Sequence, residues 1–311
     1  MTITIISHPD CMLHDAGSTH PESKMRIQVI NEALKRYPFK EPIHFIEALC
    51  ATKEQLMRAH DETYIDWIHS ISPKHDSIGI DADTLMNPHT YRAALLAAGA
   101  VVLAVDCVMQ EKSQVVFCNV RPPGHHAEKD KAMGFCFFNN VAVGVMHAIA
   151  EYKLHRIAII DFDVHHGNGT QNIFQHDKRV LYCSSFEHPL YPGYDEENDN
   201  EHIIGVPLKA GTEGKEFREK VKAAWFDKIL AFKPELVFFS AGFDAHIKDP
   251  LADLKLLEDD YVWLTKEIKK LSKQSAAGKM ISVLEGGYHL EALAHSVPLH
   301  VAAMSFTFDE V

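Results

Sequence analysis

The sequence predicts one α/β domain in three layers, with helices on both faces of a mostly parallel central β-sheet. Six short β-branched or apolar runs recur along the 311 residues, and helix-forming stretches lie between them. Continuous apolar runs of this length are typical of strands buried on both faces of a parallel sheet. Alternating strands and helices imply crossover connections that cover both faces. No repeat, low-complexity tract or linker divides residues 1–311, so a single domain is expected.

The individual elements follow from these patterns. Strands are expected, in chain order, at ITIIS (3–7), SQVVFCNV (113–120), RIAIIDFDV (156–164), RVLYCSS (179–185), ELVFFSAG (235–242) and KMISVLEGG (279–287). Helices are expected near 22–36, 53–70, 139–152, 213–232 and 258–274. A further helix should begin at Asn87-Pro88, with asparagine as the cap and proline in the first turn, and end near Gln110. The polar run DEENDNEH (195–202) indicates a surface loop.

Composition excludes several classes of protein. With 31 basic and 43 acidic residues, the formal charge of −12 argues against a nucleic-acid footprint, which needs a basic face. The same charge would mildly attract cationic substrates. The sequence contains no run of about 18 uncharged apolar residues, so no membrane span is expected. Six scattered cysteines without a CxxC pair, and a start without a basic, apolar leader, predict a reduced protein of the cytoplasm. Export into a host cell stays open as an alternative.

Polar residues follow four of the predicted strands directly. Because ligands bind beyond the carboxyl ends of parallel strands, chemically capable residues are expected at these positions. The segments are RPPGHH with His125 and His126, DFDVHHGNG from Asp161 to Gly169, FD with Asp244, and EGGY from Glu285 to Tyr288. Taken singly, each segment has an ordinary structural explanation: an ion-paired cluster, a solvated loop, a helix cap or a turn. Their equivalent topological positions favour a shared site.

Asp161, Asp163 and His165 alternate along a strand end, so their side chains should point to one side. Carboxylates packed this closely repel unless a cation or proton intervenes, and a divalent metal suits carboxylate and imidazole together. Asp163, His165 and Asp244 would supply three ligands and leave a coordination position open. Catalytic zinc sites need such an opening, whereas structural sites are closed by four protein ligands.

Several strings resemble the histone deacetylase and acetylpolyamine amidohydrolase family over nearly the whole chain. They are HPES (20–23), IDADTLMNPHTYRAALLAAGA (80–100), RPPGHHA (121–127), GFCFFNN (134–140), DFDVHHGNGTQ (161–171), SAGFDAH (240–246), DPL (249–251) and LEGGY (284–288). Some members of the family carry aspartate at the position of Asn168. Asparagine at this position resembles the class II branch and the bacterial enzymes. The resemblance implies the arginase/deacetylase-like form of the three-layer fold.

The resemblance also implies residue roles. Asp163, His165 and Asp244 would bind zinc (Zn2+), with iron(II) as an alternative because the set is rich in oxygen. His126 would act as general base and then general acid, with Asn168 behind it. His125 would give electrostatic support, with Asp161 behind it. Tyr288 would donate its hydroxyl to the oxyanion.

Substrate and ion contacts are implied in the same way. Gly134 and Phe135, together with Tyr191, would wall a tunnel suited to the methylene stem of lysine. Leu251 would lie near the tunnel mouth, where an acidic residue in the family favours charged polyamines. A structural potassium ion (K+) would be held by Asp161, Asp163, His165, Ser184 and Ser185, mostly through backbone carbonyls.

Four functions therefore remain in view. The leading hypothesis is a zinc hydrolase of linear amide bonds that removes acetyl groups from lysine in proteins or peptides. The second is an amidohydrolase for acetylpolyamines or other small acetylated amines. A binding module that recognises acylated lysine without chemistry is the third. An arginase-like binuclear manganese hydrolase would need an additional acidic motif, which the sequence lacks. The oligomeric state is left open.

Overall fold

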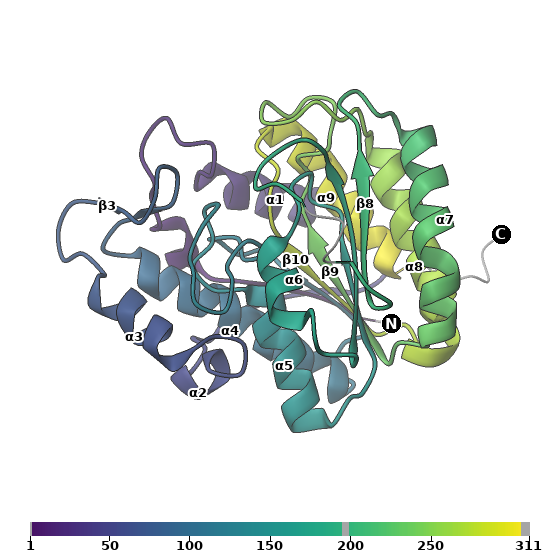
Figure 1. Ribbon diagram of the computed structural model, residues 1–311, viewed down its shortest axis with the longest axis horizontal. Coiled ribbons are helices and arrows are strands. Elements are labelled where there is room, and N and C mark those ends of the chain that lie inside the picture. The colour runs from purple at the N-terminus through teal and green to yellow at the C-terminus, as the bar shows by residue number, and fades with distance from the viewer. Residues whose placement is uncertain (1, 195–198, 306–311) are drawn as a thin grey trace.

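The central sheet of the computed structural model, which describes residues 2–194 and 199–305, has eight strands that pair in parallel throughout. In spatial order they are β2 (Ile43–Glu47), β1 (Ile3–Ser7), β5 (Val115–Cys118), β10 (Met280–Leu284), β9 (Leu236–Ala241), β6 (Ile157–Asp161), β7 (Val180–Glu187) and β8 (Ile203–Leu208). A two-stranded antiparallel pair, β3 (Ile78–Gly79) and β4 (Leu85–Met86), lies outside this sheet (Figure 1).

Helices cover both faces of the sheet, which confirms the predicted three-layer α/β class (Figure 1). One face carries α1 (Met25–Arg36), α7 (Gly214–Phe232), α8 (Glu258–Ala276) and α9 (Leu290–Ser305). The other carries α3 (Glu62–Ser70), α4 (Thr90–Met109), α5 (Asn140–Tyr152) and α6 (Asn168–Phe174). Short helices η1 (Pro9–Met12) and α2 (Lys53–Leu56) complete the set.

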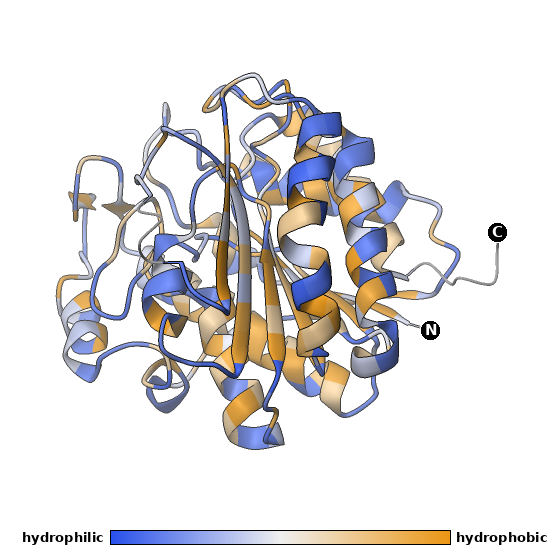
Figure 2. Cartoon of the chain, turned by 45° about the vertical axis from the view of Figure 1, so that its right-hand side comes forward, coloured by the Kyte–Doolittle hydropathy of each residue, from blue (hydrophilic) through white to orange (hydrophobic). Residues whose placement is uncertain are grey.

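Two separate cores result from the period of two along each strand. In β6, Ile157 and Ile159 belong to the core under α4 and α5, whereas Ile160 belongs to the core under α7 and α8. The strands are therefore apolar on both sides, and Figure 2 shows the hydrophobic colour concentrated along them. This burial on both faces is why continuous apolar runs identified the inner strands.

The structure differs from the predicted elements at several places. The predicted helix over 53–70 is two helices, α2 and α3, separated by residues 57–61. The helix expected from Asn87-Pro88 is regular from Thr90, and the Asn87 side chain accepts the amide of His89, two residues on, as a helix cap does. Edge strands β2 and β8, and helices α6 and α9, were not predicted. Of the expected surface loop 195–202, residues 195–198 lie outside the described residues.

Helix α4 is the one helix in the described part of the chain that is long and apolar enough to span a membrane by length and composition. However, 72% of its apolar window is buried inside the protein, as in a core helix. Its apolar character is explained by packing between α5 and the sheet.

Gly99 in α4 allows a backbone segment to lie directly on the helix. A Cβ atom at Gly99 would fall 1.8 Å from the Leu49 carbonyl oxygen and 2.5 Å from the Ala51 amide nitrogen. The Ala51 amide donates to the Leu95 carbonyl at 2.8 Å, which holds the segment in place. The contact is therefore backbone against backbone.

We predict that Gly99→Ala destabilises the protein by about 3 kcal/mol, although alanine is the better helix former by about 1 kcal/mol. Urea unfolding measures the difference. Gly144→Ala is the matched control, because a Cβ there meets the side chain of Val101 rather than backbone. A smaller loss is expected for the control, and equal stability of Gly99→Ala and the wild type would contradict the account.

Candidate active site

Four loops meet at the carboxyl edge of the sheet. They follow β5, β10, β9 and β6, which are consecutive neighbours in the sheet. These are the same four segments in which the sequence places polar residues after apolar runs. The topology therefore brings side chains from distant parts of the chain to one place.

Asp163, His165 and Asp244 form a compact group whose potential ligand atoms lie within 4.8 Å of one another. His165 Nδ1 lies 3.1 Å from Asp163 Oδ1 and 3.3 Å from Asp244 Oδ2. Two ligand atoms at tetrahedral angles, each about 2.1 Å from a zinc ion, are about 3.4 Å apart. The spacing thus fits a shared ion.

Further observations fit a cation at this position. The Asp244 Oδ2 atom is buried and makes no hydrogen bond. Gly242 and Gly286 pack against the carboxylates so closely that an added Cβ would lie 2.1 Å from Asp163 Oδ2 and 2.0 Å from Asp244 Oδ2, respectively. An unsatisfied buried carboxylate oxygen is costly unless a proton or metal compensates it.

The charges of the group also attract a positive ion. Burial alone would lower the pKa of His165, but the adjacent carboxylates of Asp163 and Asp244 outweigh burial and raise the pKa to about 10. The pKa of Asp244 is raised by burial and by the charge of Asp163. Without a metal, His165 would hold a proton beside the two carboxylates, where a divalent cation can bind.

The tandem histidines have different partners. His125 Nδ1 lies 3.1 Å from Asp161 Oδ2, and His126 Nδ1 lies 2.8 Å from Asn168 Oδ1. Burial disfavours charge on both rings, but Asp163 and Asp161 overcome it at His125 and raise its pKa to about 10. At His126, burial and the neighbouring charges of His125 and His165 lower the pKa well below its usual value. The pair therefore consists of one charged and one neutral imidazole.

Glu285, directly after β10, supports the histidine loop from beneath. Its Oε2 accepts the Gly124 amide at 2.7 Å and the His125 amide at 3.1 Å. Burial raises the pKa of Glu285 to about 7, against the opposing charge of His125. Glu285 opens the EGGY segment named in the sequence analysis, but its role in holding the histidine loop was not predicted.

Aromatic rings lie on both sides of the group. Tyr191 is edge-on to His126, with ring centroids 5.2 Å apart, and 6.3 Å from His165. The ring centroids of Phe135 and Tyr288 are 6.0 Å apart. Gly134, at φ +55°, packs so tightly that a Cβ would lie 2.5 Å from the His126 ring. Gly134, Phe135 and Tyr191 thus lie around the site with Tyr288.

Tyr288 and Leu251 are joined through Asp249. The Asp249 carboxylate accepts the Tyr288 amide at 2.7 Å and the Leu251 amide at 3.1 Å. The Gly286 amide donates to Asp163 at 2.8 Å, so the loop that carries Tyr288 is anchored on a carboxylate of the candidate metal-binding group.

Ser184 and Ser185 lie on β7, where Ser184 pairs in register with Asp161. Ser184 Oγ is buried without a hydrogen-bond partner in the described structure. An oxygen in this state is available to a small cation.

A buried ionic cluster behind Tyr288 was not predicted. Glu22 Oε1 lies 2.9 Å from Arg26 Nη1 and 2.5 Å from Arg121 Nε, and Glu22 Oε2 lies 3.3 Å from His14 Nε2. Arg26 also donates to the Gly287 carbonyl at 2.6 Å, and its guanidinium lies 4.9 Å from the centre of the Tyr288 ring. Burial opposes ionisation of Glu22, but its cationic partners lower its pKa well below the usual range. The cluster ties α1 and the histidine loop to the tyrosine loop.

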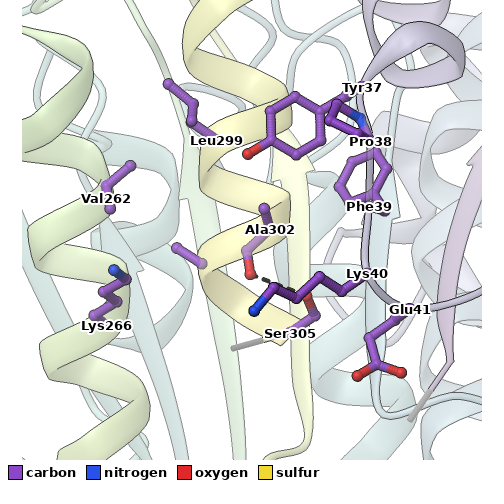
Figure 3. A pocket seen from close by; sticks show the side chains of 11 residues that line it. Tyr37, Pro38, Phe39, Lys40, Glu41, Val262, Lys266, Leu299, Ala302 and Ser305 are labelled. Carbon is purple, nitrogen blue, oxygen red and sulfur yellow. Dashed lines mark hydrogen bonds between the residues drawn. The ribbon is translucent and has the colours of Figure 1, made fainter. Parts of the chain in front are cut away.

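A separate hollow of about 480 Å³ lies at the opposite edge of the sheet, where residues 37–41 lead into β2. Side chains of this loop, α8 and α9 line it (Figure 3). In the part of the chain that the structure describes, the one candidate metal-binding group is the one at the carboxyl edge. The hollow is therefore not a competing metal centre.

Comparisons with known proteins show similar sequences and a similar fold. The family model described as histone deacetylase domain matches residues 20–304. A probable deacetylase of Archaeoglobus fulgidus is 32% identical over 317 residues, covering 99% of this chain and 88% of that protein. Polyamine deacetylase HDAC10 of Danio rerio is 35% identical over 299 residues, which cover 88% of this chain and 42% of that protein. The crystal structure of the HDA15 HD domain superposes with a TM-score of 0.90 at 31% identity, covering 97% and 88% of the two chains.

We predict that Glu22→Gln lowers the free energy of unfolding by about 3–5 kcal/mol, because it leaves two buried arginines without their carboxylate. Urea unfolding is the measurement. Glu62→Gln removes an exposed carboxylate, 57% accessible, from its pair with Lys53 and serves as the matched control. Similar stabilities of the two variants would show that the buried cluster is not stabilising.

Proposed function

Because this chain belongs to the histone deacetylase family, a family of hydrolases, we propose that it is a zinc-dependent enzyme that removes acetyl groups from acetyl-lysine in proteins or peptides. The observation that carries the proposal is the group Asp163, His165 and Asp244 beside a pair of histidines with unequal pKa values. These are the parts that metal-assisted amide hydrolysis requires.

Asp163, His165 and Asp244 would hold the divalent ion. When bound, the ion would polarise the acetyl carbonyl and lower the pKa of water toward about 7. The two carboxylates make the ligand set rich in oxygen, so iron(II) is the alternative metal. Metal analysis after reconstitution with each ion decides between them.

His126 is the general base in this proposal because it is the neutral imidazole of the pair. It takes a proton from the attacking water and returns it to the departing amine. His125 stays charged beside Asp161 and stabilises negative charge that develops at the carbonyl. Different neighbours therefore give two adjacent histidines separate roles.

Tyr288 would donate a hydrogen bond to the developing oxyanion. Burial first, and then the charges of Asp244 and Asp163, raise the pKa of its hydroxyl well above the usual value, against the effect of Arg26. The hydroxyl thus keeps its proton at neutral pH, as a donor must. Arg26 and Asp249 hold the loop that carries it.

The substrate class is inferred from the aromatic walls and from Leu251. Phe135 and Tyr191 would enclose a methylene stem, and an uncharged residue at position 251 offers no counter-ion to a polyamine. The alternative is an acetylpolyamine or another small acetylated amine, which a relative named as a polyamine deacetylase supports. Ser184, Ser185 and the 161–165 segment would hold a potassium ion below the site.

The test compares kcat/KM for an acetyl-lysine peptide and for acetylspermidine with zinc-loaded protein. Faster turnover of the peptide is expected. A preference for acetylspermidine would establish the alternative substrate class, and tight binding of the peptide without acetate release would indicate a binding module.

We predict that Asp244→Ala loses bound metal and activity together, because it removes one of three ligands. Metal content after gel filtration and acetate release measure the two effects. Asp259→Ala, an exposed aspartate near the start of α8, is the control and should retain both. Full metal content in Asp244→Ala would remove Asp244 from the ligand set.

Tyr288→Phe, by contrast, should keep its metal and lose about 100- to 1000-fold in kcat. The hydroxyl is needed in the transition state rather than for metal binding, so KM should change little. An unchanged kcat with intact metal would show that Tyr288 takes no part in the reaction.

A further inference from the structure

A carboxylate lies behind the uncharged partner of His126. We propose that Glu128 is a positioning residue, which fixes the amide of Asn168 and thereby selects the tautomer of His126 that can act as a base. The catalytic consequence rests on the proposed function; the tautomer itself does not.

The argument starts from the acceptor-only chemistry of a carboxylate. Glu128 Oε1 lies 2.8 Å from Asn168 Nδ2, so the amino side of the amide must face Glu128. The carbonyl side, Oδ1, then faces His126 Nδ1 at 2.8 Å. Because a carbonyl oxygen also only accepts, Nδ1 of His126 must carry the proton. The other ring nitrogen, Nε2, keeps the lone pair that a general base needs.

The remaining neighbours of the Asn168 amino group agree with this orientation. Met133 Sδ lies 3.3 Å away and the His126 carbonyl oxygen 3.5 Å away, and both are acceptors. These contacts are weak, since sulfur is a poor acceptor and 3.5 Å is a long hydrogen bond. The carboxylate of Glu128 is therefore the decisive partner.

Glu128 is itself held in place by its backbone. Its amide donates to the Lys131 carbonyl at 2.9 Å, and its carbonyl accepts from His60 Nδ1 at 2.9 Å. His60 is buried, and its Nε2 accepts the Asn139 amide at 2.9 Å, so its Nδ1 is the nitrogen that donates. A buried imidazole thus secures the turn from which the Glu128 side chain extends.

The neighbouring histidine shows why an intervening amide matters. The Asp161 carboxylate contacts the His125 ring directly, so a positive charge on that ring would be stabilised. At His126 a carboxylate is also present, but the Asn168 amide stands between its charge and the ring. The amide transmits the orientation of the hydrogen bond without placing a negative charge on the imidazole. His126 is thereby fixed in one tautomer while it remains neutral.

Glu128 and Asn168 also border a hollow of about 460 Å³ that is lined by polar side chains. In a Glu128→Ala variant, water from this hollow can replace the carboxylate. Water both donates and accepts, so it does not select an orientation of the amide. The rest of the site has no reason to rearrange.

The experiment uses zinc-loaded protein labelled with ¹⁵N-histidine, without substrate. Long-range ¹H–¹⁵N spectra distinguish the two neutral tautomers, and the His126 signals are assigned by their loss in His126→Gln. We expect wild-type protein and Glu128→Gln, whose amide oxygen can still accept from Asn168, to show the proton on Nδ1. Glu128→Ala should show a mixture of tautomers. Lys129→Ala, an exposed neighbour, is the control and should match the wild type.

In turnover assays, Glu128→Ala should lose about 10-fold or more in kcat with little change in KM, and Glu128→Gln should restore most of the loss. A single Nδ1-protonated tautomer in Glu128→Ala would overturn the proposal, whether or not the protein is a deacetylase. An equal kcat loss in the Gln and Ala variants would also overturn it, since it would make the charge rather than the orientation decisive. Failure of the proposed function alone would leave the spectra as expected but give no acetate release in any variant.

Discussion

Two aspartates that are buried at the ends of neighbouring parallel strands set the constraint on which the rest of the site depends. Asp163 follows β6 and Asp244 follows β9, and each is about 1% exposed. Charges in this environment are costly unless an opposite charge compensates them. His165 completes the candidate ligand group, and the absence of side chains at glycines 242 and 286 leaves room for the two carboxylates. In the proposed function, a cation held by this group would give the histidine pair and Tyr288 a common place at which to act.

The groups around this centre are held by a further layer of buried polar contacts. Glu285 supports the backbone at His125, Asp249 holds the Tyr288 amide, and Arg26 links the tyrosine loop to Glu22. Catalytic geometry is maintained when the supporting side chains are themselves packed and hydrogen-bonded. Glu128 extends the same principle to the internal state of one ring, because it decides which nitrogen of His126 is protonated.

Much of the fold and the central residues could be predicted from the sequence because the signals are local. Apolar runs identified the inner strands, and the spacing of Asp161, Asp163 and His165 follows directly from strand geometry. The edge strands were missed because β2 is half-exposed and β8 contains Gly205 and Pro207. The Glu22–Arg121 pair joins residues 99 positions apart, and no local pattern marks such a contact. Tyr182, whose hydroxyl donates to Asp161, looked like one more apolar strand residue.

The central claim is that one divalent ion is shared by Asp163, His165 and Asp244, with a coordination position left for water and substrate. Anomalous diffraction at the zinc edge from crystals of the zinc-loaded protein tests it most directly. A single strong peak within about 2.0–2.2 Å of one atom from each of the three side chains is predicted, with no fourth protein ligand. A peak at another location, or a protein side chain in the fourth position, would contradict the account.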